Sequence, residues 1–348
     1  VKLHFDIYDH VPVIRKHMEI FNESDEPVNL DSFKLEHLFF AEPESTEGDM
    51  SRRYLPNIHI ESDYTMGGTF WEYTGDRTEH WTTDKEYTSQ CNYGLNTLCT
   101  LDVYNEIGPD VEITKDAPFS SYKVYEMPMD TYDRERKGLF LRRFYRTIAP
   151  WTTENPIFMH LTTIDEKIVK RAVDQCVEAG YEMIILSFGS GMNAETTDEK
   201  HIAYIKSLVD YAKSKGIEMG GYSLLASRWI SDEVDVINPA TGKRGGATFG
   251  SSPCLCSQWG VDYLAKIRNF YEKTGLTLFE HDGSYPGDVC ASTKHAYHKG
   301  LNDSQWKQFE RIRDLYHWCL ANGISLNVPD FYFLNGSTKT SIGYREVN

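Results

Sequence analysis

The stretch Leu276-Thr-Leu-Phe-Glu-His-Asp-Gly-Ser-Tyr-Pro-Gly-Asp288 decides how this chain folds. Its first part, residues 276–279, is apolar and lies between a glycine and a Gly/Pro turn, a pattern typical of a buried strand. Three titratable side chains come where this strand ends, namely Glu280, His281 and Asp282. Such groups are costly to bury unless they are paired or used, and parallel α/β sheets place substrate sites at the carboxyl ends of their strands. We therefore expect a functional site here; a solvated strand end capped by a turn is the alternative.

A pattern of strand, loop, helix and glycine repeats around this stretch from residue 155 onward. The expected strands are 157–161, 181–188, 217–225, 276–279 and 324–328, and the expected helices are 165–179, 199–215, 261–273 and 304–321, the last capped by Ser304. A glycine follows each helix, and the next strand starts at once. Because a left-handed glycine permits such a tight connection, the pattern predicts a parallel βα sheet of the TIM-barrel type.

Residues 1–145 are expected to form a separate β domain. Strand-like runs at 13–21, 30–40, 57–60, 69–73, 101–104 and 122–126 alternate with turn residues, and helical periodicity is absent. This spacing is typical of a β-sandwich. The second domain, 146–348, has room for five strands, whereas a closed barrel of ~250 residues needs roughly three more βα units. We expect the barrel to be truncated after its fifth strand; an open doubly wound sheet is the alternative.

The composition excludes two classes of partner. The 348 residues carry a net charge of −16, whereas nucleic acids and anionic membranes attract basic surfaces. No apolar run approaches the ~20 residues of a membrane helix. Aromatic residues make up 13% of the chain, which suits sugar stacking as well as core packing. The chain starts at Val1 without a signal-peptide pattern, as a processed or cut piece would; a secreted or periplasmic location is favoured, and self-association into a homo-oligomer stays open.

The cysteines and histidines give no clear metal signature. The seven cysteines are irregularly spaced, and no CxxC or Cys/His zinc pattern is present. His295 and His298 have a ligand-like i, i+3 spacing, but no third ligand follows at a known spacing. A disulfide among Cys254, Cys256 and Cys290 is conceivable, since all three lie in expected loops. We predict no metal and no cofactor.

Several short motifs resemble one known family. They are Pro12-Val13-Ile14-Arg15-Lys16, Ile148-Ala-Pro-Trp151 and Glu154-Asn155-Pro156-Ile157, followed by a barrel whose fourth strand ends in a lone Asp. This order resembles the α-galactosidase (melibiase) superfamily of retaining glycoside hydrolases, in the branch with an N-terminal β-sandwich. The resemblance implies cleavage of α-linked sugars by double displacement, with Asp282 as the nucleophile. It also implies an acid/base carboxylate after the sixth strand and a sugar-binding loop after the fifth.

Two positions depart from the family pattern. Two residues before the nucleophile the family has a Lys that bonds sugar hydroxyls, and this chain has Glu280. After the second strand the family has acidic residues and a Trp, and this chain has Ser187-Phe188-Gly189. Galactose specificity is therefore less firmly implied than the fold and the nucleophile, and a modified or different sugar fits these changes.

The expected substrate is an oligosaccharide or polysaccharide. The candidate binding residues lie at the strand ends and in the loops that follow them: Glu280, His281, Tyr222, Arg228, Tyr285, Asp288, Asn335, Arg345 and Glu346. Structural alternatives are a surface salt bridge for Arg228, a satisfied core imidazole for His281 and a turn cap for Asp288. Retention needs a second carboxyl group ~5–5.5 Å from the nucleophile, for which the chain offers Asp288, Glu346, Asp330 and Glu280. A non-catalytic carbohydrate-binding protein on the same fold is the alternative function.

Overall fold

The computed structural model describes residues 1–41, 55–64, 78–86, 97–152, 156–247, 250–283, 286–328 and 332–338. The chain divides into two compact units, Val1–Ile148 and Ala149–Asn348. The strand predicted at 69–73 lies outside the described residues. In the part of the chain that is described, no helix is both long enough and apolar enough to cross a membrane.

The first unit is built from antiparallel sheets. One sheet has the order β1-β2-β10-β5, with β9 also paired to β2; a second pairs β3 with β8, and a third has the order β4-β7-β6. The bounds are β1 Lys2–Ile7, β2 Ile14–Ile20, β3 Val28–Leu30, β4 Glu36–Phe39, β5 Ile58–Ser62, β6 Glu79–Thr82, β7 Thr100–Val103, β8 Val111–Ile113, β9 Phe119–Ser120 and β10 Val124–Pro128. The predicted β character of this region is confirmed, and its arrangement as a two-layer sandwich stays a prediction.

A helix that the sequence analysis missed closes this unit. α1, Arg134–Ile148, is rich in arginine and exposes most of its surface. Phe144 and Tyr145 are its buried residues; the Tyr145 hydroxyl donates to Glu61 Oε2 at 2.7 Å, and the Phe144 ring lies edge-on to Tyr125. Only these two residues are buried, so the buried face of the helix is narrow and its remaining surface is rich in arginine.

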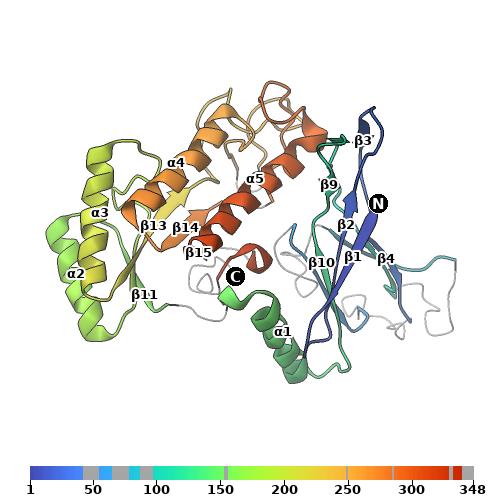
Figure 1. Ribbon diagram of the computed structural model, residues 1–348, viewed down its shortest axis with the longest axis horizontal. Helices are drawn as coiled ribbons and strands as arrows, with labels where there is room; N and C mark the ends of the chain where they lie inside the picture. The colour runs from blue at the N-terminus through green and yellow to red at the C-terminus, as the bar shows by residue number, and fades with distance from the viewer. Residues whose placement is uncertain are drawn as a thin grey trace. The chain divides into compact units, whose positions relative to one another are not determined.

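The second unit is a single parallel sheet whose five strands follow one another in chain order, from β11 to β15. The strands are β11 Phe158–Leu161, β12 Met183–Leu186, β13 Glu218–Leu224, β14 Leu278–Asp282 and β15 Ser325–Asn327. The helices α2 Glu166–Ala179, α3 Glu199–Ser214, α4 Gln258–Thr274 and α5 Leu301–Ala321 connect them and lie along one face of the sheet (Figure 1). Two short 3₁₀ turns, η2 Pro150–Thr152 and η3 Phe333–Asn335, complete the unit. The five predicted parallel strands are confirmed, and they fit a partial barrel.

Local capping explains where most of these helices begin and end. Asp165 accepts a hydrogen bond from the main-chain N–H of Ile168 and starts α2, as a short polar side chain does at an N-cap. Gly180 and Gly275 end α2 and α4 in the left-handed conformation, the role predicted from the sequence. One cap was wrongly predicted: α5 begins at Leu301 rather than at Ser304. The Asp303 carboxylate accepts from the N–H groups just before this helix and thereby moves its start upstream.

The face of the sheet opposite the helices has two layers. Side chains of paired residues in a parallel sheet share a face, and they alternate along each strand. The layer nearer the amino ends of the strands is apolar, with Met183, Ile185 and Leu278 buried together and Phe158 packed against them. Two residues further along the strands, the side chains on this face become polar. The candidate site therefore sits on a packed apolar floor at the carboxyl ends of the strands.

Candidate active site

Six polar side chains gather at the carboxyl ends of the five strands. Tyr222 of β13 is in register with Glu280 of β14, which is in register with Asn327 of β15. The sheet therefore presents these three side chains on one face. The full set is His160, Ser187, Tyr222, Glu280, Asp282 and Asn327.

Glu280 is the centre of this set. Its side chain is completely buried, and Oε2 accepts hydrogen bonds from His160 Nε2 at 2.6 Å and from Asn327 Nδ2 at 2.7 Å. The Ser187 hydroxyl donates to Oε1 at 3.2 Å. A buried carboxylate is tolerated when hydrogen bonds replace its lost hydration, and these donors come from three different strand ends. Glu280 is thereby held by the protein itself.

Asp282 lies at the last position of β14 and is only partly buried. The Tyr222 hydroxyl donates to its Oδ2 at 3.2 Å. Its main-chain carbonyl accepts from the N–H groups of Leu225 and Ala226, both at 2.8 Å. The backbone of Asp282 is therefore fixed against the end of the neighbouring strand, while its side chain is partly exposed.

A hollow of ≈ 350 Å³ lies beside Tyr222, where β12 and β13 end. Phe188 lines it, is 66% exposed and meets the Tyr222 ring edge-on, with the ring centroids 5.7 Å apart. Arg228 also lines the hollow, but its Nη1 donates to Glu195 Oε1 at 2.6 Å and to the Leu224 carbonyl at 2.7 Å. The salt bridge that the sequence offered as an alternative for Arg228 is therefore present, at the edge of this hollow.

The expectation that His281 binds substrate requires correction. Alternation along β14 turns its side chain away from Glu280 and Asp282, toward the helices, and its imidazole is completely buried. Nε2 lies 3.0 Å from the Tyr263 hydroxyl of α4, and Nδ1 lies 2.9 Å from the Tyr316 hydroxyl of α5. Burial lowers the pKa of His281 to about 3. It is a neutral core imidazole with both nitrogens engaged, as the structural alternative required.

The other predicted site residues are dispersed. Asp288 is buried in the loop after β14, where its carbonyl accepts from Gln308 of α5. Asn335 is buried in η3, with its Oδ1 3.1 Å from His317 Nε2. Three predicted binding residues and one alternative carboxylate lie outside the described residues: Tyr285, Arg345, Glu346 and Asp330.

Two residues of the polar layer were missed from the sequence. Asn327 ends β15, His160 lies one residue before the end of β11, and both contact Glu280. The rule that identified Asp282, a polar residue where a parallel strand ends, applies to them equally. Neither stood out, because a single polar residue after an apolar run is common.

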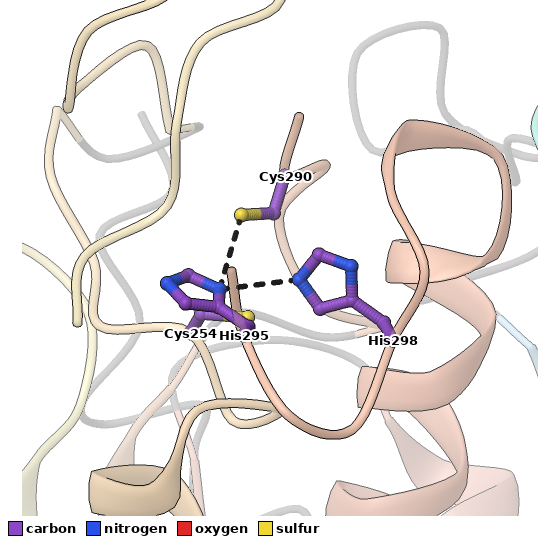
Figure 2. Close-up of side chains that lie close together, drawn as sticks. All are labelled: Cys254, Cys290, His295 and His298. Carbon is purple, nitrogen blue, oxygen red and sulfur yellow. Dashed lines mark hydrogen bonds between the residues drawn. The ribbon is translucent and has the colours of Figure 1, made fainter. Parts of the chain in front are cut away.

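A second cluster lies in the loops next to this site. Cys254, from the loop between β13 and α4, meets Cys290, His295 and His298, from the loop between β14 and α5 (Figure 2). One potential ligand atom from each lies within 4.8 Å of all the others, and all four side chains are buried. The described cysteines, which are 99, 176, 254, 256, 290 and 319, are free thiols. The spacing of residues along the sequence does not reveal this cluster, because Cys254 comes from a different loop than the other three residues.

Comparison with solved structures shows which known proteins share this fold. No family model and no curated protein sequence matches this chain. Among solved structures, the α-galactosidase from Lactobacillus brevis matches with a TM-score of 0.62 at 13% identity, over 96% of this chain and 53% of its own. GH36 α-galactosidase AgaB from Geobacillus stearothermophilus matches with a TM-score of 0.63 at 12% identity, over 97% and 55%.

A variant of GH36 α-galactosidase AgaA from Geobacillus stearothermophilus, solved in complex with raffinose, matches with a TM-score of 0.60 at 12% identity, over 97% of this chain and 55% of its own. This chain thus spans about half the length of the solved structures that it matches. At such low identities the likeness shows a shared fold. The structural resemblance to α-galactosidases that the sequence motifs predicted is confirmed.

Proposed function

We propose that this chain, which shares its fold with GH36 α-galactosidases, belongs to a glycoside hydrolase that cleaves α-linked sugars with retention, and that Asp282 is its nucleophile. The observation that carries the proposal is the position of Asp282: a partly exposed carboxylate at the carboxyl end of the fourth strand of a partial barrel. This is the position that the family resemblance assigns to the nucleophile. In the proposal, residues 146–348 carry the chemistry and 1–145 form a β-sandwich domain.

In this mechanism the Asp282 carboxylate attacks the anomeric carbon, and the leaving sugar oxygen takes a proton from a second carboxyl group. Water then hydrolyses the glycosyl–Asp282 ester and releases the sugar with its original anomeric configuration. The hydrogen bond from Tyr222 to Oδ2 fixes the orientation of the carboxylate. Tyr222 is therefore a positioning residue for the nucleophile.

The substrate class in this proposal is an oligosaccharide. Two variants of AgaA that share the fold were solved in complex with raffinose and with stachyose. Here the hollow beside Tyr222, with the exposed Phe188 ring on its wall, gives a sugar an apolar surface to stack on. Arg228 at its edge, together with Asp288, Asn335, Tyr285, Arg345 and Glu346, stays proposed as substrate-binding.

The enclosure of Glu280 supports a sugar other than unmodified galactose. Where the family has a Lys that reaches sugar hydroxyls, Glu280 directs its carboxylate to His160, Ser187 and Asn327. The sugar contact made by that Lys is therefore replaced by contacts within the protein. The same observation favours a second candidate function, a carbohydrate-binding protein that recognises sugar on this face without cleaving it.

The decisive experiment compares Asp282→Asn with Asp262→Asn, an exposed aspartate on α4, in a form of the protein that includes the acid/base carboxylate expected after the sixth strand. An amide has nearly the shape of the acid but is a far weaker nucleophile, so we expect Asp282→Asn to lose several orders of magnitude in turnover of aryl α-glycosides and to keep its melting temperature. Asp262→Asn should retain full turnover. Azide should restore turnover to Asp282→Gly and give a glycosyl azide of inverted configuration.

Two other outcomes have distinct meanings. A loss of about 1 kcal/mol of stability with turnover intact would make Asp282 a structural cap of the turn that follows it. Binding of an α-linked oligosaccharide in calorimetry, without turnover of any aryl α-glycoside by a form of the protein that includes the acid/base carboxylate expected after the sixth strand, would establish the carbohydrate-binding function instead.

A further inference from the structure

The four side chains of the Cys/His cluster converge on one point. His295 Nδ1 lies 3.5 Å from Cys290 Sγ and 3.1 Å from His298 Nε2, and the Cys254 side chain lies behind the His295 ring (Figure 2). A tetrahedral ion with Zn–S and Zn–N bonds of about 2.3 and 2.0–2.1 Å would hold its ligand atoms about 3.3–3.8 Å apart. The separations in this cluster are those of a site that closes around an ion with a small adjustment of the side chains.

Each histidine ring has one nitrogen that faces the cluster and one that faces away from it, called here the inner and the outer nitrogen. The hydrogen bond of the outer nitrogen determines whether the inner nitrogen carries a lone pair. His295 Nε2 lies 3.1 Å from the Glu233 carbonyl, and His298 Nδ1 lies 3.1 Å from the Gly300 carbonyl. A carbonyl oxygen only accepts, so each outer nitrogen carries the proton and each inner nitrogen of a neutral ring carries a lone pair. His295 Nδ1 and His298 Nε2 therefore face each other as two acceptors at 3.1 Å. Such a contact requires a cation between them or an extra proton on one ring.

The surroundings resemble the outer shell of a metal centre. Metal-binding histidines usually donate their second N–H to a carbonyl or a carboxylate, which sets the tautomer and the ring orientation. Both rings do so here, and His298 Nδ1 also lies 3.9 Å from Asp303 Oδ1. The main-chain N–H of Ile237 donates to Cys290 Sγ at 3.4 Å, as N–H groups do toward a thiolate ligand.

The choice of metal follows from the ligands. Two thiolates and two imidazoles in tetrahedral proximity select Zn²⁺ among the common divalent ions. Two thiolates neutralise the ion, so the completed site can be buried without net charge. All four positions come from the protein and all four side chains are buried, with Cys254 and Cys290 completely so. This is the form of a structural zinc site, with no coordination position left for a substrate.

We propose that Cys254, Cys290, His295 and His298 bind one structural Zn²⁺, which joins the loop after β13 to the loop after β14. The second of these loops follows Asp282 directly, so the ion would fix the chain on one side of the candidate nucleophile. This proposal reaches beyond the proposed function and does not depend on it, since a sugar-binding protein would need the same loops ordered.

The test uses metal analysis and cobalt spectroscopy of the intact, reduced protein. We expect about one equivalent of zinc per chain after purification without chelators. Replacing it with Co²⁺ should give the intense visible bands of a tetrahedral site and a near-ultraviolet thiolate-to-cobalt charge-transfer band. Cys290→Ser and His298→Gln should each weaken metal binding at least tenfold. Cys176→Ala, a buried free thiol on α2, should leave it unchanged.

A ligand variant that fails to fold does not obscure the result, because the cobalt spectrum of the unmodified protein is decisive by itself. A folded, reduced protein that takes up no Co²⁺, or shows only the weak bands of six-coordinate cobalt, overturns the proposal. So does a Cys254–Cys290 disulfide whose reduction creates no metal site. Full metal retention by both ligand variants likewise overturns it, and Cys256, buried among the same side chains, would then be examined as a ligand. Because metal content is measured without any substrate, failure here leaves the glycosidase proposal untouched.

Discussion

Glu280 Oε2 and His160 Nε2 lie 2.6 Å apart, although β14 and β11 are separated in the sheet by two other strands. In a flat sheet, strands in those positions would be about 14 Å apart, beyond the combined lateral reach of the two side chains. The sheet must therefore curl toward the face that carries Glu280. One hydrogen bond thus indicates the curvature of a barrel in a sheet of only five strands.

Glu280→Gln should destabilise the protein by about 3 kcal/mol, because an amide cannot accept from every donor that surrounds this buried carboxylate. Urea unfolding measures the loss. Glu178→Gln, an exposed change on α2, should stay within about 0.5 kcal/mol of the unmodified protein. A cost at Glu280 as small as the control would mean that the network adds little to folding.

Tyr222→Phe should lower kcat/KM for an aryl α-glycoside by about tenfold to a hundredfold, the effect of losing a hydrogen bond of roughly 1.5–3 kcal/mol to a charged group. The loss should appear in kcat, since in the proposed mechanism Tyr222 positions the nucleophile. Tyr211→Phe is the matched control, because it removes a tyrosine–carboxylate bond to Asp174 on an exposed helix surface. Equal rates for the two variants would contradict a positioning role for Tyr222.

Phe188→Ala should raise KM severalfold and leave both kcat and the melting temperature unchanged. The ring is 66% exposed at the edge of the hollow beside Tyr222, so its removal costs sugar stacking and little packing. Phe39→Ala removes a ring that is 64% exposed on β4 and should not affect KM. An unchanged KM for Phe188→Ala would place the sugar elsewhere.

Stability should fall in mild acid because of His281. Its pKa is about 3 when folded and ~6.5 when unfolded, so as the pH falls below 7 the unfolded chain takes up a proton that the folded chain refuses. This residue should therefore lower the free energy of unfolding by about 2 kcal/mol between pH 7 and pH 5. In His281→Gln, urea titrations should show a shallower pH dependence over that interval. A parallel pair of curves would show that His281 titrates normally in the folded chain.

The order of elements in the second unit was predictable because local chemistry specifies it. Asp165 begins a helix and Gly180 ends it in both the sequence pattern and the structure. The position of Asp282 followed as well, since it needs only the end of an apolar run. The partner of each side chain was less predictable. Side chains alternate between the two faces of a strand, so the face on which His281 lies depends on β14 continuing in regular alternation as far as Asp282.

Contacts between distant segments could not be deduced from one sequence. His160 and Asn327 reach Glu280 across 120 and 47 positions, and no local pattern encodes such pairings. The Cys/His cluster was missed for the same reason, because Cys254 joins a loop that begins after β14. α1 was missed because its buried face is narrow and arginine-rich sequence surrounds it.

The sharing of one carboxylate by three strand ends makes these positions evolve as a set. A homologue with lysine in place of Glu280 would replace an acceptor with a donor, so the imidazole of His160 would have to take its other tautomer and the amide of Asn327 would have to turn its oxygen toward the ammonium group. Such chains should also carry acceptors or small residues at those two positions. A single replacement at position 280 would therefore disturb the hydrogen bonds of three strand ends at once, and changing the sugar specificity proposed for this face would take concerted substitutions.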